Sequence, residues 1–152
     1  MLDKLTTLFD RAFAGTPVDD PQGREQGLRV ATALLLIEVA RADNADDFAE
    51  DDAMLAALRQ FFALGEDETQ LLLTEARRTA DHAVELQQFT RRLHEQLSHA
   101  EKLRVVEMLW QVALANFKLD KFEDYTVRKI ADLLYVSQSD LIRIRNRVRG
   151  DR

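Results

Sequence analysis

Two short acidic segments hold the residues best suited to chemistry in this chain of 152 residues. The first segment runs from Asp43 to Asp52 and contains six carboxylates and no basic residue. Crowded carboxylates repel one another, and a hard divalent cation such as Ca²⁺ or Mg²⁺ relieves that repulsion through oxygen ligands. The candidate ligands of the first segment are Asp43, Asp46, Asp47 and Glu50. The same acids would also serve as helix caps or as partners of a helix dipole, so both interpretations stay open.

A second segment repeats the first with fewer carboxylates. Its candidate cation ligands are Asn116, Asp120 and Glu123, which form a weaker set than the ligands of the first segment. In each segment the first residue precedes the glutamate by seven positions, from 43 to 50 and from 116 to 123. Lys118 and Lys121 offset the charge of the second segment, so we expect a Glu123→Gln substitution to change cation binding little.

The residues around the two segments predict helices. Residues 66–149 contain neither glycine nor proline, which favours helix and disfavours a turn-rich β fold. Ser98 begins a capping box and Ser137 a second cap. We predict an all-α fold of seven to eight helices without strands, with Gly65 ending the helix that begins near Ala49 or Glu50. Other predicted helices cover roughly 2–14, 24–42, 83–96 and 123–135.

An internal repeat of three helices spans most of the chain. The first copy covers about 24–80 and the second about 99–149. Each copy needs the other to bury its apolar face, so we predict one single-domain bundle over residues 1–152, with pseudo-twofold symmetry. The residues predicted to be buried in the common core are Leu35, Val39, Leu58, Phe61, Val106, Trp110, Ile130 and Leu133.

Composition narrows the classes of function. The chain lacks cysteine, which excludes disulfides, thiolate metal sites and cysteine nucleophiles. No apolar run approaches the roughly 18 residues that span a membrane, so we expect no membrane insertion and a cytoplasmic protein. The net charge of −6 argues against nucleic acid as a partner. No catalytic nucleophile or histidine–carboxylate site is visible, so we expect no enzymatic activity and no certain cofactor.

Several stretches together resemble a known family. They are residues 109–113 and 128–137 in the second repeat, and residues 34–36 and 61–64, with Glu50, in the first. This combination is similar to the TerB-like family of the tellurite resistance protein TerB superfamily. The family's Ala-Asp-Gly pattern appears as Ala-Asp-Asn in the first acidic segment and as Ala-Asn-Phe in the second.

The resemblance covers roughly residues 24–149 and implies an all-helical pseudo-twofold fold, a role in metal-ion handling and no established enzymatic activity. We therefore expect a non-enzymatic bacterial module that binds a divalent cation through its acidic interhelical segments in a stress or metal-ion response. The alternative is an ion-free scaffold for protein–protein interaction. We expect an unknown protein partner, with a homodimer as one form that it could take.

Overall fold

The chain folds into an all-α domain, as the sequence predicts. The computed structural model describes residues 21–42, 48–81, 85–115 and 120–150. Within these ranges it contains seven helices and no strand. The helices are α2 (Pro21–Ala40), α3 (Phe48–Phe62), α4 (Glu66–Ala80), α5 (Leu86–Gln96), α6 (His99–Ala113), α7 (Lys121–Leu133) and α8 (Gln138–Arg149). The helix predicted at about 2–14 lies outside the described residues.

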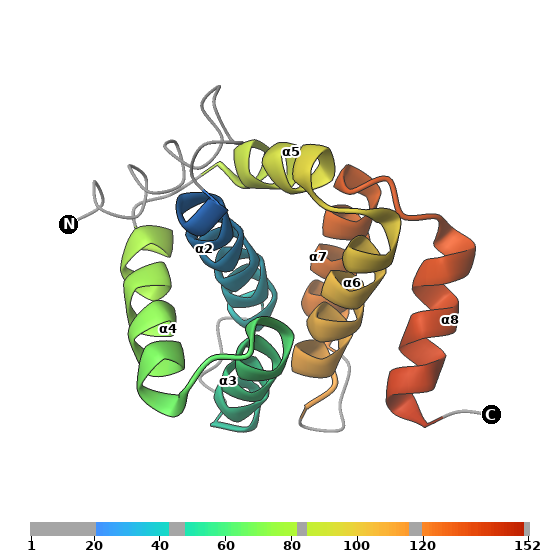
Figure 1. Cartoon of the computed structure of the whole chain (residues 1–152). Coiled ribbons are helices and arrows are strands. Elements are labelled where there is room, and N and C mark those ends of the chain that lie inside the picture. The colour runs from blue at the N-terminus through green and yellow to red at the C-terminus, as the bar shows by residue number, and fades with distance from the viewer. Residues whose placement is uncertain (1–20, 43–47, 82–84, 116–119, 151–152) are drawn as a thin grey trace.

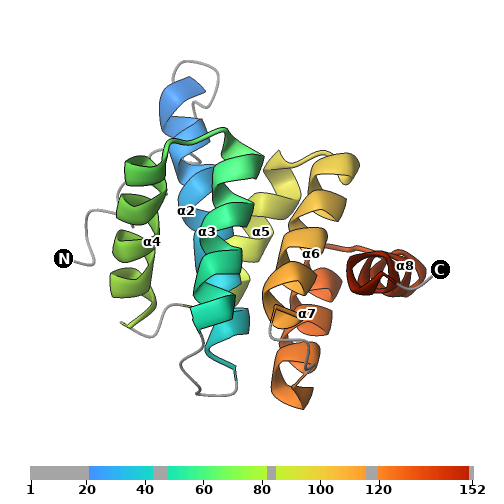
Figure 2. The same ribbon diagram turned by 90° about the horizontal axis from the view of Figure 1, so that it is seen from below.

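Helices α2 and α6 form the centre of the domain. They lie side by side and run in the same direction, so that their last turns reach the same end of the molecule (Figure 1). Helices α3 and α4 pack on α2, while α7 and α8 pack on α6. Two further contacts cross between the halves, because α3 also packs on α6 and α7 also packs on α2. This exchange ties the two halves into one domain, which Figure 2 shows from below.

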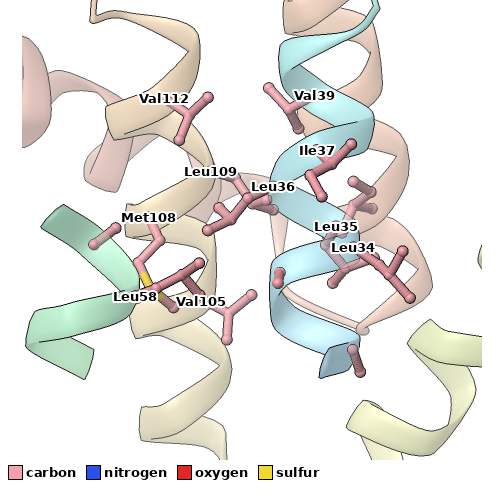
Figure 3. Close-up of a cluster of buried hydrophobic side chains, with 14 of the residues drawn as sticks. Leu34, Leu35, Leu36, Ile37, Val39, Leu58, Val105, Met108, Leu109 and Val112 are labelled. Atoms are coloured by element: carbon pink, nitrogen blue, oxygen red, sulfur yellow. The ribbon is translucent and has the colours of Figure 1, made fainter. Parts of the chain in front are cut away.

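The core between α2 and α6 is aliphatic. Leu36 of α2 meets Leu109 of α6, and Val39 and Val112 lie level with each other near the ends of the two helices (Figure 3). Leu58 of α3 packs into the same cluster. Apolar burial of this kind contributes roughly 25 cal/mol for each Å² removed from water. The core therefore draws on both halves, and neither half could bury its apolar face alone.

The predicted core residues are confirmed except at two equivalent positions. Six of them are buried, namely Leu35, Val39, Leu58, Val106, Trp110 and Ile130. Phe61 and Leu133 are only partly buried, and the next residues, Phe62 and Leu134, are buried instead. Both misplacements occur at the last turn of a repeat's second helix. There the chain leaves helical geometry, and the 3.6-residue period no longer decides which side chain faces the core.

Helices α3 and α7 end in the same way. Ala63 and Tyr135 adopt left-handed conformations, with φ of 54° and 60°. The following amides donate back across the last turn, from Leu64 N to Arg59 O at 3.0 Å and from Val136 N to Ala131 O at 2.9 Å. These bonds are those of a Schellman motif. The prediction that Gly65 ends α3 was therefore wrong, because φ there is −72° and Gly65 instead precedes the first turn of α4.

The helix starts follow the predicted caps. Ser98 Oγ accepts from Glu101 N at 3.2 Å, and Glu101 Oε1 accepts from Ser98 N at 2.8 Å. Ser137 Oγ accepts from Asp140 N at 3.1 Å. The buried Trp110 then links α6 to the first turn of α8, because its Nε1 donates to Leu141 O at 3.1 Å. This hydrogen bond fixes where α8 lies on α6.

Candidate functional site

A buried glutamate occupies the third position of both α3 and α7. Glu50 is 1% exposed to solvent, and Glu123 is 0% exposed. A carboxylate in the first turn of a helix is favoured by the exposed amides and the positive end of the dipole. Burying an ionised carboxylate is nevertheless costly unless a proton, a donor or a cation compensates it. The candidate site therefore consists of two buried glutamates and not of a cluster of acids on the surface.

The phase of each helix explains why these glutamates point inward. Glu50 lies four residues before the buried Met54, and Glu123 lies four residues before the buried Val127. Residues four apart share one face of a helix, so each glutamate continues the apolar face of its own helix. This spacing is a signal that was present in the sequence. It was hidden because Glu50 stands in a run of acids that looks wholly solvated.

The acids that follow the glutamates are neutralised by arginines. Asp51 pairs with Arg77 of α4 at 2.7 Å, and Asp124 pairs with Arg128 of α7 at 2.8 Å. The basic partner that the first acidic segment lacks in sequence is therefore supplied by another helix. Each pair engages one carboxylate oxygen of Asp51 or Asp124, whereas Glu50 and Glu123 are the two acids that are buried among the described residues.

Two other acids have surface roles. Asp120 caps α7, since its Oδ1 accepts from Phe122 N at 2.8 Å and from Glu123 N at 3.3 Å. Asp120 is therefore a helix cap, a role that the sequence suggested only for acids of the first segment. Asp52 is exposed and lines a cavity of about 380 Å³ between α3 and α4, together with Arg59.

Four of the seven predicted ligands lie outside the described residues, namely Asp43, Asp46, Asp47 and Asn116. Among the residues that the structure does describe, no group of three or more acidic or histidine side chains is close enough to hold a metal ion. The full ligand set predicted from sequence therefore stays a prediction.

A further half-buried acid lies near the end of α2. Burial raises the pKa of the Glu38 carboxyl, and the charges of Arg41 and of Lys129 on α7 oppose this effect and lower the pKa. Arg41 in turn pairs with Asp81 at 2.6 Å, which holds the end of α2 against the end of α4. The electrostatics at this end of the molecule therefore couple α2 to α4 and α7.

The two glutamates belong to the same end of the domain. Helices α2 and α6 end side by side, and seven residues separate each from its next helix, 41–47 and 114–120. Helices α3 and α7, which carry the glutamates in their first turns, therefore begin near that common end. None of the described helices is both long enough and apolar enough to cross a lipid bilayer.

These features define a class: an all-α domain of two three-helix repeats, with a buried glutamate opening the second helix of each. The family model described as tellurite resistance protein TerB matches residues 29–146. The match spans well over half of the chain, and the chain belongs to this family. No curated protein and no solved structure matches it significantly.

Proposed function

We propose that this chain is a non-catalytic TerB-family module that holds one divalent cation at the end where α3 and α7 begin. The observation that carries the proposal is the burial of Glu50 and Glu123 at equivalent positions of the two repeats. Carboxylate oxygens are the ligands that Ca²⁺ and Mg²⁺ prefer. A shared cation would lower the cost of keeping two carboxylates buried at one end of the domain.

The remaining oxygen ligands would come from the acidic segments. Asp43, Asp46 and Asp47 follow the end of α2, while Asn116 and Asp120 follow the end of α6. Helices α2 and α6, which precede these segments, end side by side (Figure 1). Backbone carbonyls and water would complete the six to eight ligands typical of Ca²⁺.

We propose equal weight for the two glutamates, in place of the weaker second set expected from sequence. That ranking relied on Lys118 and Lys121 offsetting the second segment. The Lys121 ammonium lies 5.2 Å from the centre of the Phe122 ring, on an exposed part of α7, whereas Glu123 is fully buried. Lys121 is therefore a poor substitute for a cation at Glu123.

Isothermal titration calorimetry with CaCl₂ and MgCl₂ tests the proposal. We expect one cation for each chain in the wild type, and at least a tenfold weaker affinity, about 1.4 kcal/mol, in Glu50→Gln and in Glu123→Gln. Glu95→Gln is the control, because Glu95 is an exposed glutamate of α5. It should bind as the wild type does.

The outcomes separate the alternatives. If neither ion gives a heat of binding, the cation site is ruled out and the ion-free interaction module is the remaining alternative. Equal weakening by Glu95→Gln would mean that the ion is held by general surface charge. A role in a bacterial stress or metal-ion response is the setting that we propose for this binding, in line with the family's description.

A further inference from the structure

Exposed large apolar side chains are few and unevenly placed. Among the described residues, those more than half exposed are Leu71 at 65%, Phe122 at 53%, Tyr125 at 66% and Tyr135 at 75%. Three of the four are aromatic, and these lie on α7 or directly after it. Isolated exposed apolar residues need no explanation, but aromatics grouped on one helix face mark an interaction surface.

The aromatic residues of α7 are bracketed by lysines. Phe122, Tyr125 and Lys129 follow one another at intervals of three and four residues, so they share the face of α7 opposite the buried Val127. Lys121 lies beside Phe122. We call Lys121, Phe122, Tyr125 and Lys129 the α7 strip. Neither lysine forms a salt bridge within the described part of the chain.

The first turns of α4 carry exposed acidic residues next to an exposed leucine, so their charge is opposite to that of the α7 strip. Leu71 stands one turn after Asp67, with Glu66 and Gln70 beside them, and all four are exposed. We call these four residues the α4 strip. Glu68 differs from its neighbours because its carboxylate accepts from Gly65 N at 3.3 Å. Glu66 and Asp67 form no salt bridge with any residue that the structure describes.

We propose that the α7 strip of one molecule binds the α4 strip of a second copy. Lysines that flank aromatic rings complement acids that precede a leucine, in both charge and apolar character. Helices α2 and α3 stand between α4 and α7 in both views (Figures 1 and 2), so the two strips cannot meet within one molecule. A second copy supplies the missing surface and is always present at the same concentration.

The geometry of this contact follows from the repeat. Helix α4 corresponds to α8 and not to α7, so the two strips are different surfaces. They lie on opposite sides of α2 and α3 (Figures 1 and 2), so two molecules cannot join both pairs of strips at once, and the contact is head-to-tail. In a dimer this contact leaves one strip of each molecule free, and further copies extend it into chains or close it into rings. Each strip is small and its charges are exposed, so the association should be weak and sensitive to salt.

Sedimentation equilibrium on the full chain tests the contact, in a buffer with chelator so that no cation contributes. The wild-type average mass should rise above the 17.5 kDa of one chain between about 10 µM and about 1 mM, and less so at high salt. Phe122→Glu with Tyr125→Ser blocks one strip, and Asp67→Lys with Leu71→Lys blocks the other. Each double variant alone should stay at the mass of one chain.

Mixing the two blocked variants gives the decisive result. Each keeps one intact strip, so an equimolar mixture should form a 1:1 dimer and nothing larger. Glu95→Lys, a charge reversal on exposed α5, should associate as the wild type does. Circular dichroism spectra and melting temperatures should show that every variant is folded.

Two results would overturn the proposal. One is a wild type that stays at one chain over the whole range, and binding of a single-stranded oligonucleotide to its α7 strip would then identify nucleic acid as the ligand. The other is a mixture that stays monomeric while the wild type associates. The proposal is independent of the cation site, since chelator is present throughout.

Discussion

At the scale of single residues, Glu50 and Glu123 combine two properties that rarely coincide, full burial and a carboxylate. The sequence identified both as candidates because of their spacing within the acidic segments. It did not identify the burial of Glu50, because the five neighbouring acids concealed the helical phase that Glu50 shares with Met54. It also could not supply Arg77, which reaches Asp51 from 26 positions away along the chain. Pairings between helices depend on packing, which local periodicity does not encode.

Trp110 is the single side chain on which stability should depend most. It is fully buried and its Nε1 donates to Leu141 O across the α6–α8 contact. Trp110→Ala should lower the free energy of unfolding by about 3–5 kcal/mol, because it leaves a large cavity and an unsatisfied carbonyl. Trp110→Phe keeps most of the apolar volume and should cost less. Urea denaturation measures both, and a loss below about 1 kcal/mol for Trp110→Ala would contradict the packing.

Glu38 should make stability depend on pH. Its pKa is raised above the ordinary value of 4.5, chiefly by burial, so the folded chain binds the proton more tightly than the unfolded chain. The free energy of unfolding therefore falls as pH rises through the pKa that Glu38 has in the folded chain, because the carboxyl then loses its proton while it is still buried. Glu38→Gln should melt at a higher temperature than the wild type at pH 7, and the difference should vanish below about pH 4, where both states of the wild type are protonated.

Thermal melts from pH 3 to pH 8 follow this difference, with the exposed Glu95→Gln variant as the control for loss of one charge. A Glu38→Gln variant that is less stable than the wild type at pH 7 would show that attraction to Arg41 and Lys129 outweighs burial.

At the scale of the helices, the starts marked by side-chain caps were predicted well, whereas the ends of α3 and α7 were not. Side-chain caps such as Ser98 and Ser137 are visible in sequence because they need particular residue types. The ends of α3 and α7 depend instead on left-handed residues, and this chain uses Ala63 and Tyr135 there rather than glycine or asparagine. Gly65, the apparent stop signal, lies two residues too late. The matching misplacement of Phe61 and Leu133 in the predicted core has the same origin.

The left-handed Ala63 should be a site where glycine stabilises. A left-handed conformation costs an alanine roughly 1–2 kcal/mol, while glycine loses roughly 0.5–1 kcal/mol of backbone entropy on folding. Ala63→Gly should therefore raise the free energy of unfolding by up to about 1 kcal/mol. Ala56→Gly, at an exposed position inside α3, should lower it by roughly 0.5–1 kcal/mol. Chemical denaturation compares the two, and destabilisation by Ala63→Gly would contradict the assigned conformation.

At the scale of the whole molecule, the internal repeat determines both the core and the candidate site. The sequence predicted a domain whose halves bury one another, and the crossed contacts of α3 with α6 and of α7 with α2 are the physical form of that prediction. The parallel course of α2 and α6 could not be predicted from periodicity, because an amphipathic face carries no direction. That parallel course brings the ends of α2 and α6 to one end of the domain, where α3 and α7 begin.

The claim that the two buried glutamates share one cation is tested most directly by a double-mutant cycle. The quantity measured is the cation-dependent shift in melting temperature. At about 100 times the dissociation constant, Ca²⁺ or Mg²⁺ should stabilise the wild type by about 2.7 kcal/mol, which corresponds to roughly 5–10 °C. Glu50→Gln and Glu123→Gln should each remove about half of this shift or more, and the double variant should remove no more than either alone. Losses that add between the two variants, or a wild type without any shift, would contradict a shared site.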